Sequence, residues 1–270
     1  MKAKKVLFIT QEITPYVPET EMSLVGRFLP QAIQEKGREI RTFMPKWGCI
    51  NERRNQLHEV IRLSGMNLII DDTDHPLIIK VASIQSARMQ VYFIDNDDYF
   101  QHREMVCDEN GKEYEDNDER TIFYARGVLE TVKKLRWTPD IIHCHGWITS
   151  LIPLYVKTAY KEEPSFRDSK IVYSVYNDDF KSEYPDDFVQ RLKIKNISDE
   201  DVKSLESPIN YAEIQKLAIR YSDGIIQNSE HTLQELTDFA KESQIPVLDF
   251  QAGDNYADAF ESFYDEIMEK

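Results

Sequence analysis

Two histidines, His143 and His145, stand two positions apart in a segment whose apolar residues predict a β-strand. Alternate residues of a strand point to the same face, so this pair could ligate a metal ion while Cys144 points the other way. A metal site needs further ligands, and the sequence offers no evident third one, so we expect no metal and interpret both as structural histidines at a strand end. The opposite orientation of Cys144 also argues against a thiol nucleophile activated by imidazole.

Other residues allow both a binding and a structural interpretation. Trp147 follows His145 by two positions, and its indole face could stack on a sugar, so both residues are candidates for lining a glycan cleft. Alternatively, Trp147 is a core residue at a helix start. Ser229 is expected to cap a helix. The acidic run at 108–111 is interpreted as a solvated turn, because its glycine stands at the fourth place and not at the sixth place of a calcium loop.

The elements that position these residues alternate between strands and helices. This alternation predicts an α/β fold with a doubly wound, mostly parallel Rossmann-like sheet, to which the region 58–94 adds antiparallel β-hairpins. Ligands of such sheets bind beyond the carboxyl ends of the strands, so we expect the site just after Thr10, His143, Val175 and Gln227. The predicted strands are 5–10, 39–44, 141–143, 170–175, 224–227 and 246–250, and the predicted helical regions are 21–36, 116–137, 147–158, 186–221, 229–241 and 256–268.

Composition narrows the classes of partner. The chain has 270 residues and a formal net charge of −15, with no run rich in Lys or Arg, so nucleic acid and anionic membranes are not expected partners. Neutral partners such as glycans remain open. Three widely spaced cysteines and a start too short for a signal-peptide core predict a cytoplasmic protein. The chain contains neither a GxGxxG motif nor a P-loop, and we expect no cofactor.

Six longer segments of the chain are more specific than any single residue, because they follow one another in the same order as segments of a known family. They are VLFITQEITPYV (6–17), FLPQAIQEKGREIRTFMPKWG (28–48), VYFIDNDDYF (91–100), DENGKEYEDNDER (108–120), WTPDIIHCHGWITSLIPLYVK (137–157) and KLAIRYSDGIIQNSEHT (216–232). Across about residues 4–235 the chain resembles the amino-terminal domain of the glycogen/starch synthase family of the ADP-glucose type. Several separate motifs in the same order make this resemblance specific.

The resemblance implies a particular fold and activity. Complete family members are two-domain GT-B transferases that move glucose from ADP-glucose, or UDP-glucose in some, onto an α-1,4-glucan with retention. On this basis we expect residues 1–270 to form a single starch-synthase-type amino-terminal domain, with the last helix (256–268) packing back on it and no second GT-B domain.

The family motifs for the sugar nucleotide are replaced in this chain. In the Lys-Thr-Gly-Gly-Leu loop after the first strand, the lysine position is Pro18, the glycine positions are Thr20 and Glu21, and the aspartate shortly after is Leu24. A proline has neither an ammonium group nor a backbone N–H for a phosphate, and Glu21 brings a like charge to that place.

Two further motifs lose their polar groups. In the family's His-x-His-Asp-Trp motif the aspartate position is Gly146, and in its Thr-x-His-Asn motif the histidine that would contact the transferring glucose is Tyr176. We therefore expect a synthase-like protein of α-glucan metabolism that is catalytically impaired, and regulatory or glycan-binding. The alternative is an active glucosyltransferase that uses ADP- or UDP-glucose with a partner chain or an altered donor.

The predicted site contains no assigned catalytic residue. An exposed apolar rim around Trp147, Tyr176 and Phe180 is expected to favour a homodimer or a protein partner on the cleft face, and an α-glucan or a sugar nucleotide is the expected small ligand. The candidates for lining the cleft or binding a ligand are Glu12, His145, Trp147, Tyr176 and Asn177.

Overall fold

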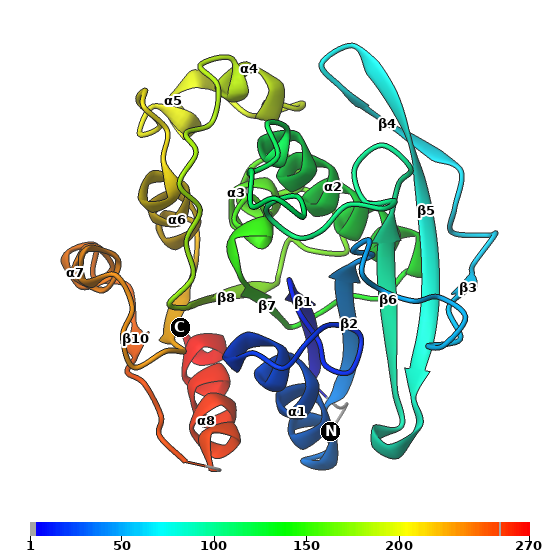
Figure 1. Ribbon diagram of the computed structural model, residues 1–270. Coiled ribbons are helices and arrows are strands. Elements are labelled where there is room, and N and C mark those ends of the chain that lie inside the picture. Colours follow the sequence, from blue (N-terminus) through cyan, green and yellow to red (C-terminus); the bar gives the residue numbers. More distant parts are fainter. Residues whose placement is uncertain (1–3, 254) are drawn as a thin grey trace.

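The computed structural model describes residues 4–253 and 255–270, which build one mixed sheet with helices on both faces (Figure 1). Parallel pairing continues through the order β10-β9-β8-β7-β1-β2-β6, and β5 then pairs antiparallel with β6, β3 and β4. This arrangement confirms the predicted doubly wound sheet with added hairpins. The strands are β1 (Lys5–Thr10), β2 (Glu39–Pro45), β3 (His58–Glu59), β4 (Met66–Ile70), β5 (Thr73–Ile84), β6 (Met89–Asp95), β7 (Ile141–His145), β8 (Lys170–Val175), β9 (Gly224–Gln227) and β10 (Val247–Leu248).

The helices form two layers (Figure 1). Side chains alternate across a strand, so Leu7 and Ile9 of β1 join the cluster beneath α2, whereas Val6 and Phe8 join the cluster beneath α1 and α8. The α-helices are α1 (Glu21–Glu35), α2 (Asn117–Leu135), α3 (Ile152–Lys157), α4 (Phe188–Leu192), α5 (Asp199–Val202), α6 (Tyr211–Arg220), α7 (Gln234–Glu242) and α8 (Tyr256–Glu269), and the short 3₁₀ segments are η1 (Gln85–Ala87) and η2 (Trp147–Thr149).

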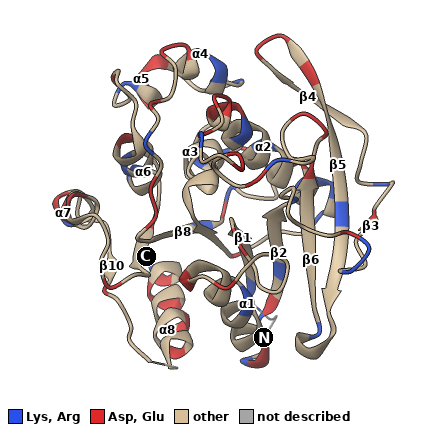
Figure 2. Cartoon of the chain, viewed as in Figure 1, with Lys and Arg blue, Asp and Glu red and all other residues tan. Residues whose placement is uncertain are grey.

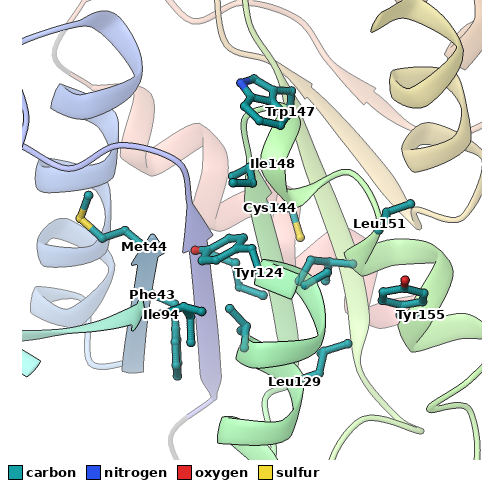
Figure 3. Close-up of a cluster of buried hydrophobic side chains, with 14 of the residues drawn as sticks. Phe43, Met44, Ile94, Tyr124, Leu129, Cys144, Trp147, Ile148, Leu151 and Tyr155 are labelled. Atoms are coloured by element: carbon teal, nitrogen blue, oxygen red, sulfur yellow. The ribbon is translucent and has the colours of Figure 1, made fainter. Parts of the chain in front are cut away.

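The larger core lies between the sheet and α2. Figure 3 shows Phe43 and Ile94 from the strands facing Tyr124 and Leu129 of α2, with Cys144 beside them. All five are fully buried. Truncating one such residue, Leu129, to alanine removes contacts and leaves a cavity, which generally costs about 2–5 kcal/mol. Among the residues that the structure describes, no helix is both long and apolar enough to cross a membrane.

Helix α8 covers the other face of the sheet closely. A Cβ at Gly224 of β9 would lie 2.8 Å from Ile267 and 2.9 Å from Phe263, so the helix reaches a distance that only glycine permits. Arg38 donates to Glu261 and Asp265 at 3.2 and 2.8 Å, which fixes the charged side of α8 (Figure 2). The chain therefore ends in a helix that is packed on α1 and β8.

Some predicted boundaries are wrong. Asp116 and Glu119 have the spacing of a capping box, but Asp116 makes no capping bond to α2, and its carboxylate accepts two hydrogen bonds from Arg103 at 2.7 and 2.5 Å. The helix predicted from Trp147 is divided into η2 and α3, and Pro153 stands in the first turn of α3, where its missing N–H removes no helical hydrogen bond. Helix α7 begins at Gln234 and not at Ser229.

Candidate functional site

Four parallel strands end side by side and bring the expected residues to one edge of the sheet. The backbone N–H of Gln11, just after β1, donates to the carbonyl of His145 at 3.0 Å, and the N–H of Asn228, just after β9, donates to Val175 of β8 at 2.9 Å. The backbone N–H of Asn177 donates to the hydroxyl of Ser229 at 2.9 Å. The segments after β1, β7, β8 and β9 thus meet, as the fold predicts.

His143 and His145 lie on the same face of β7, as their spacing predicts, with ring centroids 3.9 Å apart. Both nitrogens of His143 have partners, since Nδ1 lies 2.6 Å from the hydroxyl of Tyr264 and Nε2 lies 2.7 Å from Oγ of Ser174. Cys144 points to the opposite cluster. In the described part of the chain, no group of three acidic, histidine or cysteine side chains is placed to hold a metal ion.

Burial keeps both imidazoles neutral. It lowers the pKa of His145 to about 3 and, together with the nearby His145, holds the pKa of His143 well below its usual range. Neutral imidazoles cannot supply the positive charge that would stabilise a sugar phosphate. The pair thus acts as a hydrogen-bonded element of the fold that connects α8 to the strand ends.

Tyr176 fills the space in front of His145. Its side chain is only 3% exposed, and its hydroxyl lies 2.8 Å from Nδ1 of His145. Nδ2 of Asn228 donates to the same hydroxyl at 2.7 Å and also to Oγ of Ser174 at 3.2 Å. The hydroxyl of Tyr176 is therefore bonded within the protein, to His145 and Asn228, and the phenol ring does not face a cleft.

Gly146 has no room for the family's aspartate. Its backbone angles are φ 86° and ψ 162°, a region that is nearly restricted to glycine. A Cβ there would lie 2.7 Å from Oε1 and 2.8 Å from Cβ of Gln11, and 2.9 Å from Sδ of Met22. The chain thus closes the space of the missing carboxylate with side chains from the segment after β1 and from α1.

The amino terminus of α1 is satisfied by the protein itself. Thr20 is the N-cap: its hydroxyl accepts from the N–H of Ser23 at 3.0 Å, and its own N–H donates to Oγ of Ser23 at 2.8 Å. Oγ of Ser23 also donates to the carbonyl of Pro18 at 3.0 Å, and the hydroxyl of Thr20 donates to the Glu12 carboxylate. A phosphate at this helix end would have to compete with these bonds.

Glu21 and Leu24 lie on the outer side of the same helix. Glu21 is exposed, and its carboxylate accepts a hydrogen bond from the hydroxyl of Ser229. Ser229 therefore links α1 to the end of β8 through Asn177, and its predicted role as a helix cap is wrong. Leu24 is 37% exposed and is one of few large apolar side chains at the surface.

The expected apolar rim is not exposed. Trp147, Tyr176 and Phe180 are 1%, 3% and 4% exposed. The ring of Phe180 packs edge-on against Trp147 at 5.6 Å and stacks on Tyr184 at 5.0 Å, so the aromatic side chains bury one another. The predicted rim is therefore wrong, and Trp147 is a core residue at the start of η2.

Sequence reasoning missed Asp178, which follows Asn177 at the end of β8. Oδ1 of Asp178 accepts a hydrogen bond from the hydroxyl of Tyr211 at 2.5 Å. Burial raises the pKa of Asp178 to about 6, and the charge of Glu12 acts in the same direction. Two consecutive aspartates directly after an apolar strand, Asp178 and Asp179, were the available signal.

The sequence also gave no indication of an open groove beside this edge. The groove has a volume of about 590 Å³ and lies between the loop before α2 and the segment after β8. It combines aromatic and proline surfaces with charged groups, which suits a polar ligand with apolar faces. Its lining includes Lys112, Glu113, Tyr114, Phe180, Tyr184 and Pro185.

The parallel sheet, the two helical layers and the meeting strand ends define the Rossmann-like half of a GT-B glycosyltransferase fold. The fold is similar to that of the catalytic domain of starch synthase IV from Arabidopsis thaliana bound to ADP and acarbose, with a TM-score of 0.73 at 17% identity. That match covers 93% of this chain and 52% of the Arabidopsis chain.

Sequence comparison identifies the family. The family model for the starch synthase catalytic domain matches residues 5–246, and the chain belongs to this family. It is 36% identical over 236 residues to a glycogen synthase of Chlorobium limicola. That match covers 84% of this chain and 48% of the Chlorobium limicola protein. A glycogen synthase of Chlorobium phaeobacteroides is 40% identical over 174 residues, and that match covers 64% of this chain and 36% of the Chlorobium phaeobacteroides protein. The matched region spans about half of the Chlorobium limicola protein and about a third of the Chlorobium phaeobacteroides protein.

Proposed function

We propose that this chain acts in α-glucan metabolism as a glucan-binding or regulatory domain that does not itself turn over a sugar nucleotide. The observation that carries the proposal is that the edge of the sheet formed by the carboxyl ends of β1, β7, β8 and β9, called here the strand-end edge, is filled. The protein's own side chains lie there at the positions of the family's sugar-nucleotide motifs. The amino terminus of α1 supports it first. Thr20 and Ser23 satisfy each other there, and Pro18 has no N–H to offer a phosphate.

The second support is the filled space at β7 and β8. Tyr176 is hydrogen bonded to His145 and Asn228, and Gly146 is enclosed by Gln11 and Met22. Catalysis depends on groups that stabilise the transferring sugar more strongly in the transition state than in the ground state. Neutral, buried and internally bonded side chains do not provide such groups.

The groove beside this edge is the proposed glucan site. Tyr114 and Pro185 offer partly exposed apolar faces, while Lys112, Glu113 and Glu115 offer charged groups that can bind hydroxyls. Glu113 also holds the far wall in place, since its carboxylate accepts from the backbone N–H groups of residues 181 and 182 at 2.7 and 2.6 Å. The related Arabidopsis domain was solved with acarbose bound, which supports a saccharide as the class of ligand.

Calorimetric titration with maltoheptaose tests the proposal. We expect saturable binding to the wild-type chain and roughly five- to tenfold weaker binding to Tyr114→Ala, because an aromatic contact is worth on the order of 1 kcal/mol. Phe28→Ala is the matched control: Phe28 is 50% exposed on α1, on the other face of the sheet. Absence of glucan binding, or equal losses in both variants, would contradict the proposed site.

Active glucosyl transfer with a partner chain is the second candidate. It is favoured by the carboxylates of Glu12 and Asp178 and by the exposed Asn177, which remain at the strand ends. The test is transfer of labelled glucose from ADP-glucose and from UDP-glucose to glycogen. Transfer by the purified chain would establish this candidate in place of the first. No product with either donor, alone or with a glycogen-bound protein fraction added, would reject it.

Two finer expectations complete the proposal. The exposed Leu24 and Phe28 of α1 are the apolar residues that we assign to any contact with a second chain, and sedimentation of Leu24→Ser against the wild type tests this. All three cysteines, Cys49, Cys107 and Cys144, are unpaired, which supports the expected cytoplasmic location.

A further inference from the structure

Three buried polar atoms at the strand-end edge have no hydrogen-bond partner within residues 4–253 and 255–270. They are Oε1 of Gln11, Nε1 of Trp147 and Oδ2 of Asp178. Buried polar atoms are nearly always bonded in folded proteins, and an ordered water or a bound molecule can supply the partner that the surrounding side chains do not. These three lie at the carboxyl ends of β1, β7 and β8, where ligands of parallel sheets bind.

Contacts along the backbone bring these atoms into one neighbourhood. Oε1 of Gln11 lies 2.7 Å from the position of a Cβ on Gly146, which directly precedes Trp147. The backbone N–H of Trp147 stabilises the Asp178 carboxylate, and the charge of Glu12 acts on that carboxylate as well. Two acceptors and one donor, with a further carboxylate nearby, match the hydroxyl groups of a neutral saccharide.

Asp178 is held in an environment that opposes its charge. No Lys or Arg of the described ranges forms an ion pair with it, and its one side-chain donor is the hydroxyl of Tyr211. Burial accordingly raises its pKa to about 6, so the ionised carboxylate opposes folding above that pH. A group that lowers stability and points an unpartnered oxygen into a strand-end site is typical of a functional residue.

Phe180 separates this neighbourhood from the open groove. Its ring lies edge-on to Trp147 at 5.6 Å and to Tyr211 at 5.3 Å, and it also lines the groove. Figure 3 shows the indole nitrogen of Trp147 directed away from the hydrophobic core. Phe180 is thus in contact both with the groove and with the side chains of Trp147 and Tyr211.

We propose that Asp178 and the indole N–H of Trp147 bind the terminal sugar hydroxyls of a saccharide that lies in the groove, once the ring of Phe180 has turned aside. The carboxylate accepts hydrogen bonds from one or two hydroxyls, and the indole donates one. This inference rests on the proposed glucan-binding function and assigns to it two residues that the groove alone does not include.

The test compares Asp178→Asn with Asp179→Asn in calorimetric titrations with maltoheptaose at pH 7.5. Asp179 is the next residue and is exposed, so its variant is a matched control for the loss of one charge. We expect roughly 10- to 100-fold weaker binding for Asp178→Asn, because hydrogen bonds to a charged group are lost, and less than about twofold change for Asp179→Asn. The melting temperature of Asp178→Asn should rise, which separates a loss of binding from a loss of folding.

A second variant tests the role of the indole N–H of Trp147. Trp147→Phe keeps an aromatic ring and removes the N–H, and we expect about three- to tenfold weaker binding. Wild-type affinity in both Asp178→Asn and Trp147→Phe would mean that only water occupies the site, and would overturn the inference. If Tyr114→Ala alone loses binding, the glucan groove stands and this inference fails. If the wild type binds no glucan, both fail together.

Discussion

Substitution of Gly146 by alanine tests whether the strand-end space is closed. The new Cβ would meet Gln11 at 2.7 and 2.8 Å and Met22 at 2.9 Å, distances that real Cβ atoms do not adopt. The backbone at φ 86° and ψ 162° adds strain for any residue other than glycine. We estimate about 1–3 kcal/mol for the backbone and about 1–3 kcal/mol for overpacking, or about 4 kcal/mol in total.

The assay is thermal and urea unfolding beside a matched glycine variant. Gly37 has a similar φ of +89°, but nothing lies within 4 Å of its Cβ position, so Gly37→Ala measures backbone strain without crowding. For Gly146→Ala we expect the melting temperature to fall by roughly 8–16 °C, and for Gly37→Ala by less than half of that. Gly146→Asp, which restores the family residue, should lose at least as much as Gly146→Ala. Equal losses in Gly146→Ala and Gly37→Ala would refute the closed space.

The remaining predictions concern buried polar groups. Tyr176→Phe should lower the unfolding free energy by about 1–3 kcal/mol, because His145 loses its hydroxyl partner; urea titration measures this, and no loss would contradict the network. Because burial lowers the pKa of both His143 and His145, their neutral forms stabilise the fold above about pH 6.5 and this contribution declines as the pH falls towards 3. We expect about 1.4 kcal/mol less stability per pH unit for each histidine below 6.5, with a shallower slope in His143→Asn. Arg191→Met should cost about 3–5 kcal/mol at pH 7.5, since it leaves the Asp118 carboxylate, 3.0 Å from Arg191, buried without a counter-charge. That loss should shrink below about pH 6, because burial raises the pKa of Asp118 to about 6 and a protonated Asp118 needs no counter-charge; an unchanged loss at pH 5 would contradict this explanation.

The sequence predicted the sheet well because strands of this fold are short, apolar and separated by amphipathic helices. Strands β1, β8 and β9 begin and end where the pattern of apolar residues does. The first residues of the helices were predicted less accurately than the strands, because a polar residue near a helix start can form its hydrogen bond with a residue outside the helix. Asp116 binds Arg103, and Ser229 binds Glu21, so neither caps the helix that its spacing indicates.

The meeting of the strand ends was predictable from the sequence, but the contacts that the side chains make there were not. Spacing placed His143 and His145 on one face, and the family resemblance named Tyr176 and Gly146. Sequence could not show that Tyr176 satisfies His145 or that Met22 reaches Gly146, because these contacts join residues about 30 to 120 positions apart in the chain. For the same reason the expected apolar rim was wrong.

Asp178 was missed for a related reason. Two adjacent acidic residues are usually solvated, and only the fold shows that Asp178 is half-buried and hydrogen bonded to Tyr211 while Asp179 is exposed. An acidic residue directly after an apolar strand in a parallel sheet is therefore a signal worth testing at the level of structure.

Titration of the purified chain with ADP-glucose tests the central claim most directly. With Thr20 capping α1 and Tyr176 filling the strand end, we predict no saturable heat at millimolar ADP-glucose, while maltoheptaose binds in the same buffer. Micromolar binding of ADP-glucose that is abolished by a change near the amino terminus of α1, such as Ser23→Ala, would show that the donor site is open and would contradict the claim.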